Sequence, residues 1–165
     1  MSAASTPAPA ANRAPRAAGH YAFGQTPGQS GSMPYATGNE PVALDKPRAL
    51  VVDDAPDVTE MLSFVLRYAG YEVVPAFSGA QALDAARSAS FDVIVSDIGM
   101  PGMNGYELAE HVRALPGYER VPMIAVTGFT MYDDRDRALA SGFNAFLTKP
   151  ISPNDLISLL AGLRS

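Results

Sequence analysis

Residues 49–54 read Ala-Leu-Val-Val-Asp-Asp, a short apolar run that ends in two carboxylates. Residues 92–97 read Asp-Val-Ile-Val-Ser-Asp and end in a third carboxylate. Two later runs end in a hydroxyl and in an amine: Met-Ile-Ala-Val-Thr over residues 123–127, and Phe-Leu-Thr-Lys-Pro over residues 146–150. Short, nearly continuous apolar runs of this kind are typical of strands buried on both faces of a parallel sheet.

Segments with helical periodicity separate these runs. In residues 58–66 apolar side chains recur at i, i+3, i+4, i+7 and i+8, with Pro56 in the first turn and Gly70 at the C-terminal end. Residues 71–75 are predicted to form a further short strand. Capping patterns predict other helix starts at Ser78 with Gln81, Asn104 with Glu107 and Ser152 with Asp155, and a shorter polar helix is expected over residues 133–141.

Five strands and five helices in strict alternation predict an α/β fold, a parallel sheet with helices on both faces. Right-handed crossovers leave few topologies for such a chain. The flavodoxin-like (βα)5 three-layer sandwich, with strand order 2-1-3-4-5, fits best because it places the first and third strands side by side. The pair Asp53 and Asp54 then lies beside Asp97 at the carboxyl edge of the sheet, and Thr127 and Lys149 lie at the same edge.

The three carboxylates imply a bound cation. Without one, Asp53, Asp54 and Asp97 would repel each other and raise each other's pKa. Mg²⁺ suits this set, because it prefers a few carboxylates together with substrate phosphate. A lysine and a hydroxyl on the opposite side suit phosphoryl oxygens, so the chemistry implied is phosphoryl transfer by positioning and charge neutralisation.

The composition of the 165-residue chain changes near residue 48. Residues 1–47 hold seven of the fourteen prolines and eleven alanines, and we expect them to form a disordered tail before a domain over residues 48–165. The tail carries three basic and two acidic residues, whereas the remainder carries nine basic and fifteen acidic ones. This acidic balance argues against non-specific nucleic-acid binding by the domain.

Other features point to a soluble intracellular protein. The chain has no cysteine, so disulfides and thiolate metal sites are excluded. No apolar stretch approaches the roughly 18 residues of a membrane span, and the N-terminus lacks the apolar core of a secretory signal. We therefore expect a cytoplasmic location and no membrane partner.

Residues 47–164 resemble the receiver domain of two-component response regulators. The resemblance rests on the acidic pair after Val51-Val52, the loop of residues 96–105, the Thr127-Gly128 step and Lys149-Pro150, all in order at matching strand ends. Residues 134–150 look most like receivers that are attached to hybrid histidine kinases or stand alone. We expect a single-domain response regulator with no output domain in the chain.

The resemblance implies a role for each residue of the edge. Asp97 matches the phosphoacceptor, which takes a phosphoryl group from a phosphohistidine. Asp54 matches the direct Mg²⁺ ligand, and Asp53 the ligand that usually reaches the metal through water. Asp97 itself and the backbone carbonyl of Gly99 complete the protein's share of the coordination.

A second set of residues matches the switch of the family. Thr127 matches the hydroxyl that moves to the phosphoryl group, and Lys149 the cation that pairs with Asp97 and then with phosphoryl oxygen. The bond between Lys149 and Pro150 is cis in the family. Phe146 matches the aromatic ring that turns inward when Thr127 moves, although plain core packing would also explain a Phe at this position.

Two apolar positions bear on the lifetime of the phosphorylated state. Gly99, two residues after Asp97, offers no side chain to orient an attacking water, and Phe129 offers an apolar ring where some relatives have polar groups. We expect at most slow self-dephosphorylation and no enzymatic activity otherwise.

The partners that the resemblance implies are proteins. The phosphodonor is a histidine kinase or a phosphotransfer protein. The output is an unknown downstream protein that binds the face formed by the fourth and fifth helices and the fifth strand, without direct contact to nucleic acid.

Two other functions remain open on the sequence. A haloacid-dehalogenase-like Mg²⁺ phosphohydrolase also forms an aspartyl intermediate, but such enzymes place Asp-x-Asp after the first strand, and residue 55 is Ala. A receiver-like docking module that is never phosphorylated is the second, although the presence of all five edge residues argues against it.

Overall fold

The computed structural model describes residues 45–128 and 132–164, and within them a five-stranded parallel sheet. The strand order is β2-β1-β3-β4-β5, as predicted from the sequence. The strands are β1 (Arg48–Val52), β2 (Glu72–Ala76), β3 (Val93–Asp97), β4 (Met123–Thr127) and β5 (Ala145–Thr148). The helices are α1 (Pro56–Tyr68), α2 (Gly79–Ser88), α3 (Gly105–Arg113), α4 (Tyr132–Ser141) and α5 (Pro153–Leu163).

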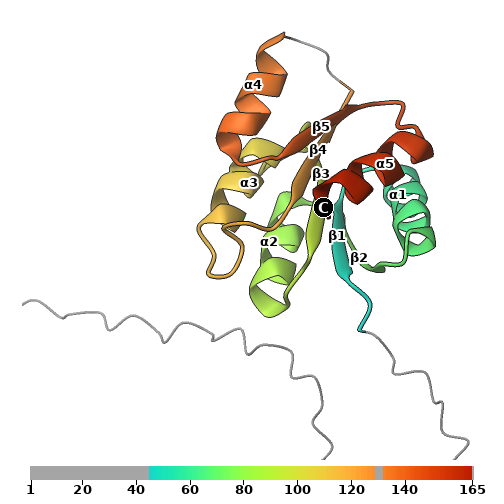
Figure 1. The fold of residues 1–165 in the computed structure, drawn as a ribbon. Coiled ribbons are helices and arrows are strands. Elements are labelled where there is room, and N and C mark those ends of the chain that lie inside the picture. The colour runs from blue at the N-terminus through green and yellow to red at the C-terminus, as the bar shows by residue number, and fades with distance from the viewer. Residues whose placement is uncertain (1–44, 129–131, 165) are drawn as a thin grey trace, which may run out of the picture. The chain divides into compact units, whose positions relative to one another are not determined.

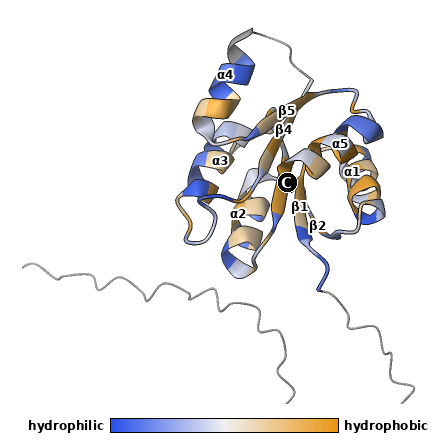
Figure 2. Ribbon diagram, viewed as in Figure 1, coloured by the Kyte–Doolittle hydropathy of each residue, from blue (hydrophilic) through white to orange (hydrophobic). Residues whose placement is uncertain are grey.

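The helices cover both faces of the sheet (Figure 1). Alternate residues of β1 enter opposite cores: Leu50 and Val52 pack with α2 and α3, whereas Ala49 and Val51 pack with α1 and α5. This alternation follows from the two-residue period of a strand. Figure 2 shows the central strands as the most hydrophobic part of the domain, with hydrophilic residues on the outer helices. The predicted three-layer sandwich is therefore confirmed.

The predicted helix ends are largely confirmed. Gly70 has a φ of 97°, in the left-handed region that glycine adopts without strain. Asn104 and Glu107 form a reciprocal capping box at α3. At α2 the prediction needs a correction: the Ser78 hydroxyl accepts from the Gln81 amide, but the Gln81 side chain accepts from the amide of Phe77, one residue before the cap.

The predicted tail lies almost wholly outside the described residues, which begin at Asp45. The Pro47 carbonyl accepts from the Glu72 amide at 2.8 Å, so the chain joins the sheet as it reaches β1. Among the described residues, none of the helices is long and apolar enough to cross a bilayer.

Candidate functional site

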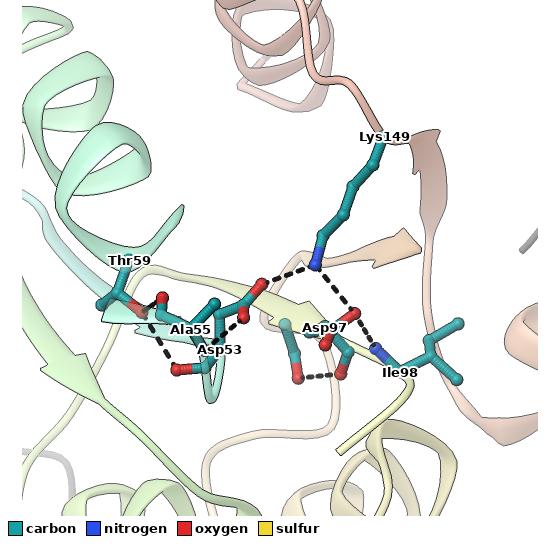
Figure 3. A network of polar contacts seen from close by, with 7 residues as sticks. Asp53, Ala55, Thr59, Asp97, Ile98 and Lys149 are labelled. Atoms are coloured by element: carbon teal, nitrogen blue, oxygen red, sulfur yellow. Dashed lines mark hydrogen bonds and ion pairs between the residues drawn. The ribbon is translucent and has the colours of Figure 1, made fainter. Parts of the chain in front are cut away.

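The carboxyl edge of the sheet brings the three predicted aspartates together. Two of them, Asp53 and Asp97, are seen in Figure 3. One carboxylate oxygen of each of Asp53, Asp54 and Asp97 lies within 4.8 Å of the others. The cause is the strand order, because β1 pairs with β3 in a register that sets Val52 opposite Ser96. Asp53 follows Val52 and Asp97 follows Ser96, so both aspartates lie at the same edge of the sheet. Asp53 and Asp97 are buried, whereas Asp54 is exposed.

Asp53 is fully buried and holds contacts through both carboxylate oxygens. Oδ1 accepts from the Ala55 amide at 2.9 Å, and Oδ2 accepts from Lys149 Nζ at 2.9 Å. The backbone of Asp53 is tied as well, since its amide donates to the Ala76 carbonyl at 3.2 Å. Asp53 is thus fixed between strands β1, β2 and β5.

Asp97 ends β3 and is 5% exposed. Its Oδ1 accepts from the Ile98 amide at 2.9 Å and lies 3.5 Å from Lys149 Nζ. Burial and then the charge of Asp53 raise the pKa of Asp97, and Lys149 and the Ile98 amide only partly oppose them. A bound cation would relieve the same repulsion, so the donor set of this edge fits a hard divalent cation such as Mg²⁺.

The loop after Asp97 is packed tightly against α3. A Cβ atom at Gly105 would collide with the Asp97 carbonyl oxygen and lie 2.7 Å from Ile98 Cα. The Gly105 amide donates to the Ile98 carbonyl at 2.9 Å. Glycine at this position therefore lets the helix start against the backbone of Asp97 and Ile98. Gly99, whose carbonyl was predicted as a metal ligand, is exposed in this loop.

Lys149 reaches both buried carboxylates, and it is nearer to Asp53 than to Asp97, the partner expected from the sequence. Burial disfavours the charged ammonium, but the Asp53 hydrogen bond and the charges of Asp97 and Asp53 outweigh it, so the pKa of Lys149 is raised. The Lys149–Pro150 bond is cis, as the resemblance implied. The Lys149 amide donates to the Thr127 carbonyl at 2.8 Å, which joins the ends of β4 and β5.

Thr127 and Phe146 occupy the other side of the edge. Thr127 is 1% exposed at the end of β4, next to β3, where Val126 is in register with Asp97. Phe146 on β5 is half-buried; it packs against the core on the α2 and α3 side and lines a cavity of about 310 Å³ together with Leu139. Among the described residues, no heavy atom lies within 4 Å of the place that a Cβ atom at Gly128 would take.

Thr59 is a member of the network in Figure 3 that the sequence did not predict. Its Oγ1 lies 3.0 Å from the Asp53 carbonyl oxygen and 3.1 Å from that of Ala55. In the sequence Thr59 occurs among the apolar residues of a helix, where nothing distinguishes it. The only hint in the sequence was Pro56. Because proline has no N–H, the first turn of α1 lacks one backbone donor that a nearby hydroxyl could replace.

Comparisons with known proteins agree with this geometry. Residues 49–161 match the response regulator receiver domain. The chain is 38% identical over 111 residues to the DNA-binding response regulator MtrA of Mycolicibacterium smegmatis, a match that covers 67% of this chain and 47% of the regulator. The chain thus spans about half the length of that relative.

Two solved structures show the same fold. Chemotaxis protein CheY4 of Vibrio cholerae is 36% identical, with a TM-score of 0.69 over 72% of this chain and 98% of CheY4. The receiver domain of sensor histidine kinase PA1611 from Pseudomonas aeruginosa is 31% identical, with a TM-score of 0.67 over 73% of this chain and 99% of that domain. That receiver holds a magnesium ion in its active site cleft.

The chain is thus a doubly wound α/β protein whose acid cluster lies at the carboxyl edge of the sheet, where proteins of this class bind their ligands. Within that class, the chain belongs to the response regulator receiver domain family. Members of this family are phosphoaccepting signalling switches of two-component systems.

Proposed function

We propose that Asp97 is the phosphoacceptor of this receiver. A carboxylate oxygen of Asp97 attacks the phosphorus of a phosphohistidine, an O–P bond forms, and the P–N bond breaks with its electron pair returning to the imidazole, which takes up a proton. The observation that carries this proposal is the position of Asp97, which is buried at the end of β3 beside two further carboxylates and Lys149.

Mg²⁺ is the cofactor that we propose for this edge, where it would neutralise the charge of the carboxylates and the phosphoryl group. The exposed Asp54 is suited to direct coordination. Asp53 is suited to a contact through water, because both of its carboxylate oxygens already accept hydrogen bonds. Asp97 and the Gly99 carbonyl complete the set.

The signal would then pass through Thr127 and Lys149. Phosphorylation adds up to about two negative charges at the end of β3. Lys149 balances this charge, the Thr127 hydroxyl donates to a phosphoryl oxygen, and the Phe146 ring turns into the space that Thr127 leaves. The surface formed by α4, β5 and α5 changes as a result, and a downstream protein binds one of the two states better.

The remaining elements of the proposal follow from the family and from individual positions. The phosphodonor is a histidine kinase or a phosphotransfer protein in the cytoplasm. Self-dephosphorylation is slow, because Gly99 has no side chain to orient water; Phe129, the other residue considered for this property, lies outside the described residues. The receiver domain of this proposal spans residues 48–165, and the expected tail lies outside the described residues up to residue 44.

Labelling with radioactive acetyl phosphate tests the assignment of Asp97. We expect Mg²⁺-dependent label in the wild-type protein and only background label in Asp97→Asn. Asp92→Asn is the matched control, since Asp92 precedes the same strand at its opposite end and accepts from the Arg48 amide at 2.7 Å. The control should keep the full label.

Two results would contradict the proposal. Label that persists in Asp97→Asn would place the phosphoacceptor elsewhere. The absence of label from the wild-type protein, both with acetyl phosphate and with phosphorylated histidine kinases, would favour the docking module that is never phosphorylated. Because the chain belongs to the receiver family, the phosphohydrolase alternative is not retained.

A further inference from the structure

The carbonyl of Asp53 lies where the chain leaves β1 and turns into α1, and a side-chain hydroxyl bonds it. This carbonyl belongs to the peptide group between the two acidic residues, just after β1 ends. A turn would normally be closed by the amide three residues later, but that residue is Pro56, which has no N–H. A buried carbonyl without a donor is costly, and a side-chain hydroxyl is one of the groups that can supply one.

Thr59 supplies the donor. It lies one turn into α1, is 1% exposed, and directs Oγ1 back towards the loop (Figure 3). Oγ1 is 3.0 Å from the Asp53 carbonyl oxygen and 3.1 Å from that of Ala55. The Ala55 carbonyl already accepts from the Thr59 amide at 3.1 Å, as the first bond of the helix. The Asp53 carbonyl is therefore the acceptor for which this hydroxyl matters most.

The bond to this carbonyl bears directly on the position of Asp54. The Asp53 carbonyl, the Asp54 amide and both Cα atoms lie in one plane, because the peptide bond is rigid. Fixing the oxygen fixes the rotation of that plane, and with it the point from which the Asp54 side chain starts. Asp53 is held independently by the Ala55 amide and by Lys149, whereas Asp54 is exposed.

We propose that Thr59 is a positioning residue for the cation site: its hydroxyl orients the peptide group between Asp53 and Asp54, so that both carboxylates face the same cation. This inference rests on the proposed function, since the cation is the Mg²⁺ of that site. The role is separate from that of the five edge residues, because Thr59 acts through the backbone.

The experiment compares Mg²⁺ affinity with stability. The dissociation constant of MgCl₂ is measured by NMR titration, and the free energy of unfolding by urea denaturation in the metal-free protein. Thr59→Val removes the hydroxyl at nearly constant shape. A second pair, Thr59→Ala and Thr59→Ser, differs only in the hydroxyl and decides the question if the valine variant fails to fold.

Ser63→Ala is the matched control. Ser63 is also buried on α1, one turn further along, and its hydroxyl donates to the Thr59 carbonyl at 2.6 Å, within the helix. Its removal costs a comparable helix hydrogen bond without touching the acidic loop. Any effect that both variants share therefore belongs to the stability of α1.

We expect Thr59→Val and Thr59→Ala to raise the Mg²⁺ dissociation constant about two- to tenfold, the range that corresponds to one net hydrogen bond. Thr59→Ser and Ser63→Ala should stay within about twofold of the wild-type value. In the metal-free protein, Thr59→Val should shift the Asp54 amide resonance more than Ser63→Ala does.

Three results would overturn the inference. Affinity unchanged in Thr59→Val and Thr59→Ala would show that the hydroxyl does not position the site. Equal weakening in Ser63→Ala would assign the effect to the helix as a whole. Failure of the wild-type protein to bind Mg²⁺ would overturn the inference together with the metal site of the proposed function, whereas the first two results leave that function intact.

Discussion

Helices α1 and α4 are attached to the same sheet in different ways. α1 follows the acidic pair and buries a mainly apolar stripe in which Leu62 and Leu66 are inaccessible to solvent. In α4, among the side chains described from residue 134 to residue 141, only Ala138 and Ser141 are buried. Figure 2 shows the corresponding contrast, with hydrophilic turns along α4.

Polar and aromatic contacts replace the apolar stripe in α4. The Tyr106 hydroxyl on α3 donates to Asp134 Oδ1 at 3.1 Å, and the Arg137 guanidinium lies 4.2 Å from the centre of the Tyr106 ring. Just after α4, the Gly142 carbonyl accepts from Arg113 Nε at 3.0 Å. Such contacts can be exchanged for others at lower cost than a buried stripe. The difference indicates a rigid side around α1, next to the proposed cation site, and a more adjustable side around α4 and β5, where we propose the output surface.

The largest loss of stability should come from a substitution in the buried apolar stripe of α1. Leu66→Ala should lower the free energy of unfolding by about 2–5 kcal/mol, because it leaves a cavity in a closed core. Leu139→Ala, at a position on α4 that is 45% exposed, should stay within about 1 kcal/mol of the wild-type value. Urea denaturation measures both. Similar losses in the two variants would remove the contrast between the helices.

The second prediction concerns the response to the phosphoryl group. Beryllofluoride with Mg²⁺, a mimic of the phosphorylated state, should shift the amide resonances of residues 132–149 more than those of residues 58–88. The reason is that the new charge attracts Thr127 and Lys149, which belong to the adjustable side. The Thr127→Ala variant should still accept phosphate on Asp97, but phosphorylation should no longer move its Phe146 ring. Shifts that are largest on α1 and α2 would reject this route.

A pH series on the metal-free protein tests the electrostatics of the rigid side. The pKa of Asp97 is raised by burial and by Asp53. A raised pKa means that the folded state favours the protonated carboxyl, so this stabilisation is complete below the ordinary value of 3.8 and is lost as the pH rises through the folded value. Asp97→Asn should therefore be more stable than the wild-type protein at pH 7 in EDTA.

The control for this prediction is to repeat the stability comparison at acidic pH. The advantage of Asp97→Asn in urea midpoint should shrink as the pH falls towards 3.8, because the wild-type carboxyl becomes neutral. Saturating Mg²⁺ should also narrow the difference at pH 7 by binding the folded wild-type protein. A variant that is less stable than the wild-type protein at pH 7 would mean that the attraction to Lys149 dominates.

The sequence predicted the sheet order and the convergence of the acids, because both follow from where apolar runs end. The resemblance predicted only Asp97 as the partner of Lys149. The closer approach of Lys149 to Asp53 was missed, since it depends on side-chain geometry across β5 and β1. Thr59 was missed for a similar reason: a hydroxyl within an apolar stripe carries no periodic signal. The Tyr106 contacts were missed because they join two helices whose separation in space is not encoded by spacing along the chain.

The smallest expected effect is at Tyr106. Tyr106→Phe removes the hydroxyl that bonds Asp134 but keeps the ring beneath Arg137, so the free energy of unfolding should fall by about 0.5–1.5 kcal/mol. Amide hydrogen exchange in α4 should accelerate more than this small change in the free energy of unfolding suggests. The reason is that few apolar contacts remain to hold that helix. Tyr118→Phe is the matched control, since the Tyr118 hydroxyl donates to the Ala89 carbonyl after α2. Equal acceleration of α4 exchange in both variants would show that α4 opens only with the whole domain, and the adjustable side would then be no more mobile than the rigid one.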